Sequence, residues 1–186
     1  MDALDADDPA DFDPATRRTV FAGDAAIAYK DPVVVADADG WHAWVCVHEV
    51  AEPAEADRMY TVYATSADGW DWSIAGRALE PRPGQWDRRG ARLASVVRQG
   101  DGVLAFYDGR ASSGQNWHEQ TGVAVGTADR LEARGEQPLA VSPHGGGALR
   151  YVSVVPRADG GYRLYYEAAA ADGSHDVRTE VVPPPG

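Results

Sequence analysis

One pattern recurs three times along the chain, and it limits the possible folds more than any other feature. Each copy consists of an apolar β-run, a polar turn with glycine and an aromatic β-run. The copies are Val33–Trp44, Ser95–Asp108 and Ser153–Glu167. Their turn glycines at positions 40, 102 and 161 are 62 (102 − 40) and then 59 (161 − 102) residues apart. A repeat of this length made of strands predicts one β-propeller blade per copy.

β-runs separated by turn signals fill each repeat, and no segment keeps a helical period. The expected strands are 32–36, 41–47, 59–65 and 72–79 in the first repeat, 92–98, 103–107, 120–126 and 130–141 in the second, and 150–156, 162–168 and 176–182 in the third. The predicted fold class is therefore all-β, with about three antiparallel blades at 31–80, 90–141 and 148–182. Because propellers have four to eight blades, three blades predict a partial domain, or an assembly that self-associates through its open edges.

The two ends of the chain carry the weakest structural signals. Residues 1–16 are acidic, with six aspartates up to position 13, and are expected to form a disordered leader. Residues 19–29 are expected to be the outer strand of a preceding or closing blade, because the third repeat lacks a fourth strand of its own and Thr19–Ala22 could supply it. Residues 183–186 are expected to be a C-terminal tail.

Composition and charge limit the classes of partner that the chain can bind. The chain has 186 residues, 44% of them hydrophobic, which is enough to bury the core of one domain. The net charge of −12 argues against nucleic acid or an anionic membrane as a partner and favours a neutral or cationic ligand. The single cysteine, Cys46, lies in an apolar run and is expected in the core. No cofactor or metal motif is found, and the acidic start without a long apolar run predicts a cytoplasmic protein.

Meander topology indicates where functional residues lie. The first two strands of a blade are joined by a short Asp-Gly turn, so the entry to strand one and the exit of strand two share the opposite face, here called the funnel face. Aligned repeats place Lys30, Arg92 and Arg150 at the entries and Cys46, Asp108 and Glu167 at the exits. Loops 48–58 and 109–119 on this face are long, and long loops on a rigid scaffold carry sites.

Further candidates on the funnel face combine aromatic rings, carboxylates and forked donors. They are Asp31, Glu49, Trp86, Asp87, Arg110, Asn116, Trp117, His118, Glu119 and His175. This combination suits a sugar, whose apolar faces stack on aromatic rings and whose hydroxyls need paired donors and acceptors. Cleaving a glycosidic bond requires two carboxyl groups, about 5 to 5.5 Å apart for retention or about 6.5 to 9.5 Å apart for inversion.

Four segments resemble the five-bladed propellers of the arabinanase, levansucrase and invertase-like glycoside hydrolases, which include uncharacterised bacterial relatives. They are Lys30-Asp31-Pro32, Ser66–Trp72, Trp86–Arg92 and Phe106–Arg110, and the resemblance covers roughly residues 29–167. It implies catalytic carboxylates at the starts of innermost strands, and Asp31 matches the one that stabilises the transition state, with Lys30 in place of Arg. The next blade, where the general acid is expected, has Arg92-Leu93 instead. Ser66–Trp72 also resembles the Asp-box turn of sialidases, a structural motif.

Two functions remain open at this point. The first is a glycoside hydrolase-like enzyme with Asp31, Asp108, Glu119 and Glu167 as candidate acids and bases. Its substrate-binding residues would be Lys30, Trp86, Asp87, Arg92, Arg110, Asn116, Trp117, His118, Arg150 and His175. The second is a carbohydrate-binding or assembly propeller, or an inactive truncated hydrolase, that keeps the scaffold without the acid pair. Two facing carboxyl groups, one with a raised pKa, would favour the enzyme, whereas one acid among several arginines would favour binding.

Overall fold

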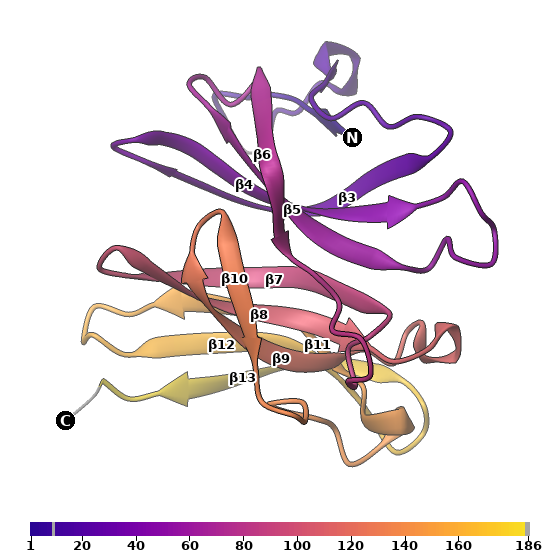
Figure 1. The fold of residues 1–186 in the computed structure, drawn as a ribbon. Coiled ribbons are helices and arrows are strands. Elements are labelled where there is room, and N and C mark those ends of the chain that lie inside the picture. Colours follow the sequence, from indigo (N-terminus) through magenta and orange to yellow (C-terminus); the bar gives the residue numbers. More distant parts are fainter. Residues whose placement is uncertain (9, 185–186) are drawn as a thin grey trace.

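The structure, a computed structural model, describes residues 1–8 and 10–184. Each of the first two repeats folds as an antiparallel four-stranded meander. The strands of the first blade are β3 (Ile27–Asp37), β4 (Gly40–Glu49), β5 (Met59–Ser66) and β6 (Trp72–Leu79), and those of the second are β7 (Gly90–Gln99), β8 (Gly102–Arg110), β9 (Gln120–Thr127) and β10 (Arg130–Arg134). One parallel pair, Met59 with Gly90, joins the two blades. Figure 1 shows β3–β6 splayed away from the stack that begins with β7.

The third repeat forms a sheet of three strands, β11 (Leu149–Pro156), β12 (Tyr162–Ala169) and β13 (His175–Val182). In the described part of the chain no strand pairs with the outer edge of β13. Thr19, expected to help close this blade, pairs with Asp2 instead, through β1 (Asp2–Ala3) and β2 (Arg18–Thr19). The all-β class is confirmed, and the only helical elements among the described residues are the short 3-10 turns Pro14–Thr16, Ser113–Gln115 and Gly145–Gly147.

Two strand boundaries differ from the sequence prediction for local reasons. β10 ends at Arg134, not near residue 141, because Gly135 has a φ of +79° that no strand continues. β3 begins at Ile27, before Pro32, because a register shift between Lys30 and Val33 accommodates the proline that cannot donate to the ladder.

The N-terminal segment is ordered in the structure, in place of the disordered leader expected from its aspartates. The terminal amine of Met1 donates to the carbonyl of Phe21 at 2.6 Å. Phe21 is 5% exposed and packs with Val45 and Val62 on the face of the first blade that points away from the second. The segment therefore covers part of a sheet face that would otherwise lie open to solvent.

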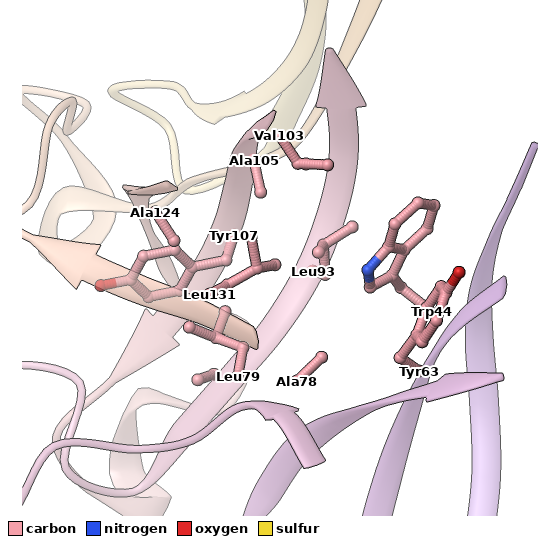
Figure 2. Close-up of a cluster of buried hydrophobic side chains, with 11 residues drawn as sticks. Trp44, Tyr63, Ala78, Leu79, Leu93, Val103, Ala105, Tyr107, Ala124 and Leu131 are labelled. Carbon is pink, nitrogen blue, oxygen red and sulfur yellow. The ribbon is translucent and has the colours of Figure 1, made fainter. Parts of the chain in front are cut away.

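The main core lies between the first and second blades. Trp44 and Tyr63 of the first blade face Leu93 and Leu131 of the second, as Figure 2 shows. Trp44 is fully buried, and its indole Nε1 donates to the carbonyl of Ala128 at 2.7 Å, so its one polar group is satisfied. Burying such a ring contributes about 1.5–3 kcal/mol from its apolar area alone.

The Ser66–Trp72 turn has the internal hydrogen bonds that the Asp-box resemblance implies. Ser66 Oγ accepts from the Gly69 amide at 2.9 Å, and Asp68 Oδ1 accepts from the amides of Trp70 and Asp71 at 2.8 and 2.9 Å. The motif therefore fixes the connection between β5 and β6 and takes no part in the funnel face.

None of the helices in residues 1–8 and 10–184 has the length and hydropathy of a membrane span.

Candidate functional site

The entry and exit positions of the blades face one another as the repeat alignment predicts. Lys30 pairs with Cys46 across β3 and β4, Arg92 with Asp108 across β7 and β8, and Arg150 with Glu167 across β11 and β12. Each innermost strand also has a register shift near its entry residue, directly after Lys30 in β3 and Arg150 in β11, and one residue later, after Leu93, in β7. A shift at this place turns the strand and aims its first side chains toward the centre of the propeller.

Arg92 is the centre of the first group of charges. Its side chain is 3% exposed and donates twice to Asp108 Oδ2, at 3.2 Å from Nε and 2.8 Å from Nη2. Its Nη1 donates to Asp31 Oδ2 at 3.0 Å and to the Tyr151 hydroxyl at 3.0 Å. Lys30 Nζ lies 3.4 Å from the same Asp31 oxygen. One arginine thus links side chains from all three blades.

Arg150 organises a second group. It donates to Glu119 Oε2 at 2.8 Å and to Glu167 Oε1 at 2.7 Å. The same Glu167 oxygen lies 2.6 Å from Nδ1 of His175, at the start of β13. The guanidinium carbon of Arg150 is 5.3 Å from the ring centre of Trp117, which is 64% exposed. This group therefore presents an aromatic face, a carboxylate and an imidazole together.

Arg110 connects the network to loop 48–58. It donates to Glu119 Oε1 at 3.0 Å and to Asn116 Oδ1 at 2.6 Å, and also to the backbone carbonyl of Asp57. Asp57 accepts in turn from two nitrogens of Arg89, each at 2.7 Å. Glu119 thus lies between two arginines with its side chain 3% exposed, and loop 48–58 is tied to the site.

Tyr151 joins the two groups. Its ring lies 4.2 Å from the guanidinium carbon of Arg92 and 5.0 Å from that of Arg150, and its backbone amide donates to Asp108 Oδ1 at 3.0 Å. The sequence prediction did not include it. A signal was present, because Tyr151 follows the entry residue Arg150 just as Asp31 follows the entry residue Lys30.

Backbone strain is concentrated in this network. In the described part of the chain, three residues other than glycine have positive φ: Asp31 at 48°, Trp117 at 76° and Tyr151 at 55°. Such conformations cost of order 1–3 kcal/mol each and collect at functional sites. Here Asp31 contacts Arg92, Trp117 lies beside Arg150, and Tyr151 contacts both arginines.

The four candidate acids differ in accessibility and in pKa. Burial raises the pKa of Asp108 to about 6 against the opposing effect of Arg92, but this carboxylate is fully buried. Burial acts to raise the pKa values of Glu119 and Glu167, yet the hydrogen bonds and positive charges around them, chiefly those of Arg150, together outweigh burial and hold both pKa values below their ordinary range. Solvent reaches mainly Asp31 and Glu167, whose side chains are 36% and 27% exposed.

Two predicted sugar-binding residues, the buried Asp87 and the partly buried Trp86, are engaged in packing. Asp87 is fully buried and accepts from Arg82 Nε at 2.9 Å and from the Tyr107 hydroxyl at 2.7 Å. Trp86 stacks on Tyr107, with the ring centres 5.7 Å apart, and packs against Gly109. Their contacts hold the loop before β7 against the second blade, so a packing role accounts for both.

The remaining candidates lie at the margins of the network. Cys46 is buried, which raises the pKa of its thiol to about 12. Glu49 pairs with Arg77 at 3.1 Å on the outer part of the first blade, away from the arginine network. The His118 ring lies edge-on to His175, with centres 6.2 Å apart, and its Nδ1 is buried without a hydrogen bond to the described residues. Within those residues, no group of three His, Cys, Asp or Glu side chains is arranged to hold a metal ion.

Comparisons with known proteins locate the fold. No family model and no curated protein sequence matches the chain. Among solved structures it is similar to Zg3597, a family 117 glycoside hydrolase of the marine bacterium Zobellia galactanivorans, with a TM-score of 0.69 and 17% identity over 88% of this chain and 55% of that one. It is also similar to BT0996, in a structure described as an RGII complex (TM-score 0.67, 16% identity, 88% and 56% coverage). A sucrose-6-phosphate hydrolase from Lactobacillus gasseri gives 0.59, 19% identity, and 82% and 32% coverage.

The chain therefore spans about half the length, or less, of the structures it matches. At these identities the likeness shows the fold, and fold alone does not assign a reaction. The architecture of this chain is that of part of a glycoside hydrolase-like β-propeller.

Proposed function

We propose that the funnel face binds a carbohydrate, with Trp117 as the stacking platform and with Glu167, His175 and Asp31 as partners for its hydroxyl groups. The observation that carries this proposal is the convergence of strained residues on one charged network. A tryptophan that is 64% exposed gains little from burial, so packing does not offset its φ of 76°. Contact with a ligand explains why the indole is held there.

The surroundings of Trp117 suit a sugar ring. An indole face stacks on the apolar face of a saccharide, while carboxylate oxygens and an imidazole accept and donate at its edge. Arg150 lies beside the indole and fixes Glu167, so acceptor and platform keep a constant relative position. Two of the matched structures are described as complexes, one of BT0996 with RGII and one of a β-fructofuranosidase with sucrose, and the sucrose complex supports a sugar as the ligand class.

Binding is favoured over cleavage by the state of the acids. A general acid must be protonated near working pH and must also reach the glycosidic oxygen. Asp108 has a raised pKa but is fully buried, whereas Glu167 is accessible but has a lowered pKa. Arginines pair with each of the four candidate carboxylates.

Hydrolysis remains the second candidate because of Asp31. This carboxylate lies at the register shift of the innermost strand β3, is one of the two accessible acids and has a φ of 48°. It also stands in the Lys-Asp-Pro setting that resembles the transition-state stabiliser of the family. In a longer protein, further blades could provide the acid that this chain lacks.

Binding is tested by screening the purified chain on an array of plant and bacterial oligosaccharides, followed by calorimetric titration of the hits. We expect Trp117→Ala to weaken binding at least ten-fold and Trp117→Phe to retain most of it, because phenylalanine keeps an aromatic face. Phe12→Ala is the matched control, since Phe12 is 58% exposed and lies outside the site. Absence of any hit, or equal affinity of Trp117→Ala and wild type, would refute the proposal.

Hydrolysis is measured on the same hits as release of new reducing ends. Binding without release supports the first candidate. Release that disappears in Asp31→Asn, with binding retained, would establish the second.

A further inference from the structure

A cavity lies between the N-terminal segment and the first blade. Its volume is about 390 Å³, within the range of small-ligand sites. It shares no lining residue with the arginine network of the funnel face. Its walls come from the first five residues, from Val20 and Phe21, from β3 and β4, and from the Asp-box turn.

The repeat explains why there is space here. Trp41 of the first blade and Val103 of the second hold equivalent register positions, opposite Ala36 and Arg98 respectively. Val103 is 6% exposed because the first blade covers it, whereas Trp41 is 39% exposed. The N-terminal segment covers the neighbouring residues of the first blade. Because it is narrower than a blade, it lies over this end of the sheet and leaves a space beneath it.

The lining has an unusual combination of side chains. Three tryptophans, Trp41, Trp70 and Trp72, share the cavity with three carboxylates, Asp2, Asp5 and Asp68. Among the described residues that line it, none has a cationic side chain, and the terminal ammonium of Met1 donates to the carbonyl of Phe21. Aromatic faces and carboxylates both attract positive charge, and together they form the cages that bind methylated ammonium groups.

The protein itself already places a cation on one of these rings. The guanidinium carbon of Arg18 lies 4.8 Å from the ring centre of Trp70, while its Nη2 donates to Asp71 at 3.3 Å. Arg18 does not line the cavity. One indole and one neighbouring carboxylate thus already hold a cation next to the cavity. Indoles and carboxylates that line the cavity provide the same combination of groups for a ligand.

The carboxylates of the cavity are in part free to bind. Hydrogen bonds from the amides of Asp71 and Trp70 lower the pKa of Asp68, so it stays ionised in mild acid, and those bonds reach only its Oδ1. Asp2 accepts from Thr19 at 2.7 Å and pairs with Arg17 at 3.5 Å, so it is already engaged. Asp5 lies on the exposed N-terminal segment with no ion pair to the described residues.

We propose that this cavity binds an organic ammonium ion, a ligand with a positive charge carried on methyl or methylene groups. Its apolar surface would pack on Trp41 and Trp72, and its charge would lie toward Asp5 and Asp68. The net charge of −12 favours the approach of such a cation over long range. The inference does not depend on sugar binding at the funnel face.

The test compares choline with its neutral isostere 3,3-dimethylbutan-1-ol, titrated into the full chain at low salt and followed by tryptophan fluorescence and by NMR. We expect choline to bind about ten-fold more tightly, because only the charge differs. Asp5→Asn should lower the affinity for choline several-fold and leave the isostere unchanged. Asp101→Asn, at an exposed turn outside the cavity, should change neither.

A further variant, Trp70→Phe, keeps an aromatic ring and should bind choline more weakly than wild type does. Equal affinity for choline and its isostere would overturn the proposal and leave an apolar cavity without charge selectivity. Failure of choline to bind at all would overturn it as well. Neither result would bear on Trp117, so this experiment and the oligosaccharide screen fail independently.

Discussion

Replacing Arg92 with methionine removes the charge that neutralises Asp108 and keeps most of the side-chain volume. In the native protein both side chains are almost completely inaccessible, 3% and 0% exposed, and they are joined by two hydrogen bonds. Removing one partner of a buried ion pair costs about 3–5 kcal/mol, because the other charge stays buried without compensation. For a domain of this size that corresponds to a fall in melting temperature of about 6–20 °C near neutral pH.

The loss of stability caused by replacing Arg92 with methionine should depend on pH in a defined direction. Burial raises the pKa of Asp108 to about 6 even with Arg92 present, so the carboxyl favours the folded state below its unfolded pKa, and this contribution is lost as pH rises through about 6. Without the guanidinium the folded pKa rises further. Below about pH 4 the carboxyl is protonated in both proteins, and the variant should lose only packing and hydrogen bonds, about 1–2 kcal/mol. Its disadvantage should then grow as pH rises toward 8.

Urea denaturation at pH 4, 6 and 7.5 measures this directly as the difference in the free energy of unfolding. Arg98→Met is the matched control on the same strand, because Arg98 pairs with Asp37 at the surface, with its side chain 42% exposed, and should cost less than about 1 kcal/mol at every pH. The double variant with Asp108→Asn should recover stability at pH 7.5 and lose the pH dependence. A penalty that is constant with pH, or largest at pH 4, would refute the reasoning.

Three further substitutions test the scaffold by urea denaturation. Trp44→Ala removes a fully buried ring from between two blades and should cost about 3–5 kcal/mol; a cost below about 1 would mean that these blades do not pack as described. Gly122→Ala places a Cβ 2.4 Å from the buried Tyr107 ring, so overpacking should cost about 1–3 kcal/mol, whereas Gly114→Ala, with no close neighbour, should cost less. Ser66→Ala removes the hydroxyl that accepts from Gly69 and should cost about 1–2 kcal/mol, and an unchanged midpoint would contradict a structural role for the turn.

The register of the inner strands could be predicted from sequence because few alternatives satisfy it. A slip of one residue would move every apolar side chain of a strand to the opposite face. The Asp-Gly turns fix the register next to each turn, and the register shifts within β7 and β11 then bring Arg92 opposite Asp108 and Arg150 opposite Glu167. The prediction that carboxylates and cations converge depended on the alignment of the repeats and on the meander topology, and the ion pairs confirm it.

How deeply individual side chains are buried could not be predicted from the repeat pattern. Asp87 lies in a loop, and sequence does not reveal that Tyr107 and Arg82 enclose it. Likewise, Asp57 reaches the network by accepting from Arg110, 53 residues away, and its carboxylate is held by Arg89, 32 residues away, so its position depends on how two loops pack. The order of the N-terminal segment was missed for a related reason. Its aspartates indicate a solvated chain, but Phe21 packs on a sheet face that must be covered.

The three blades balance the charge of their entry residues in different ways. This difference indicates which carboxylate a ligand would contact most easily. In the second and third blades the entry arginine lies directly opposite an exit carboxylate, so charge is balanced between neighbouring strands of one sheet. In the first blade Lys30 lies opposite Cys46, which provides no carboxylate. Asp31 is instead shared between Lys30 and Arg92 of the next blade, at 3.4 and 3.0 Å. Because its partners come from two blades and solvent reaches it, Asp31 is the carboxylate that a bound hydroxyl group can most easily engage.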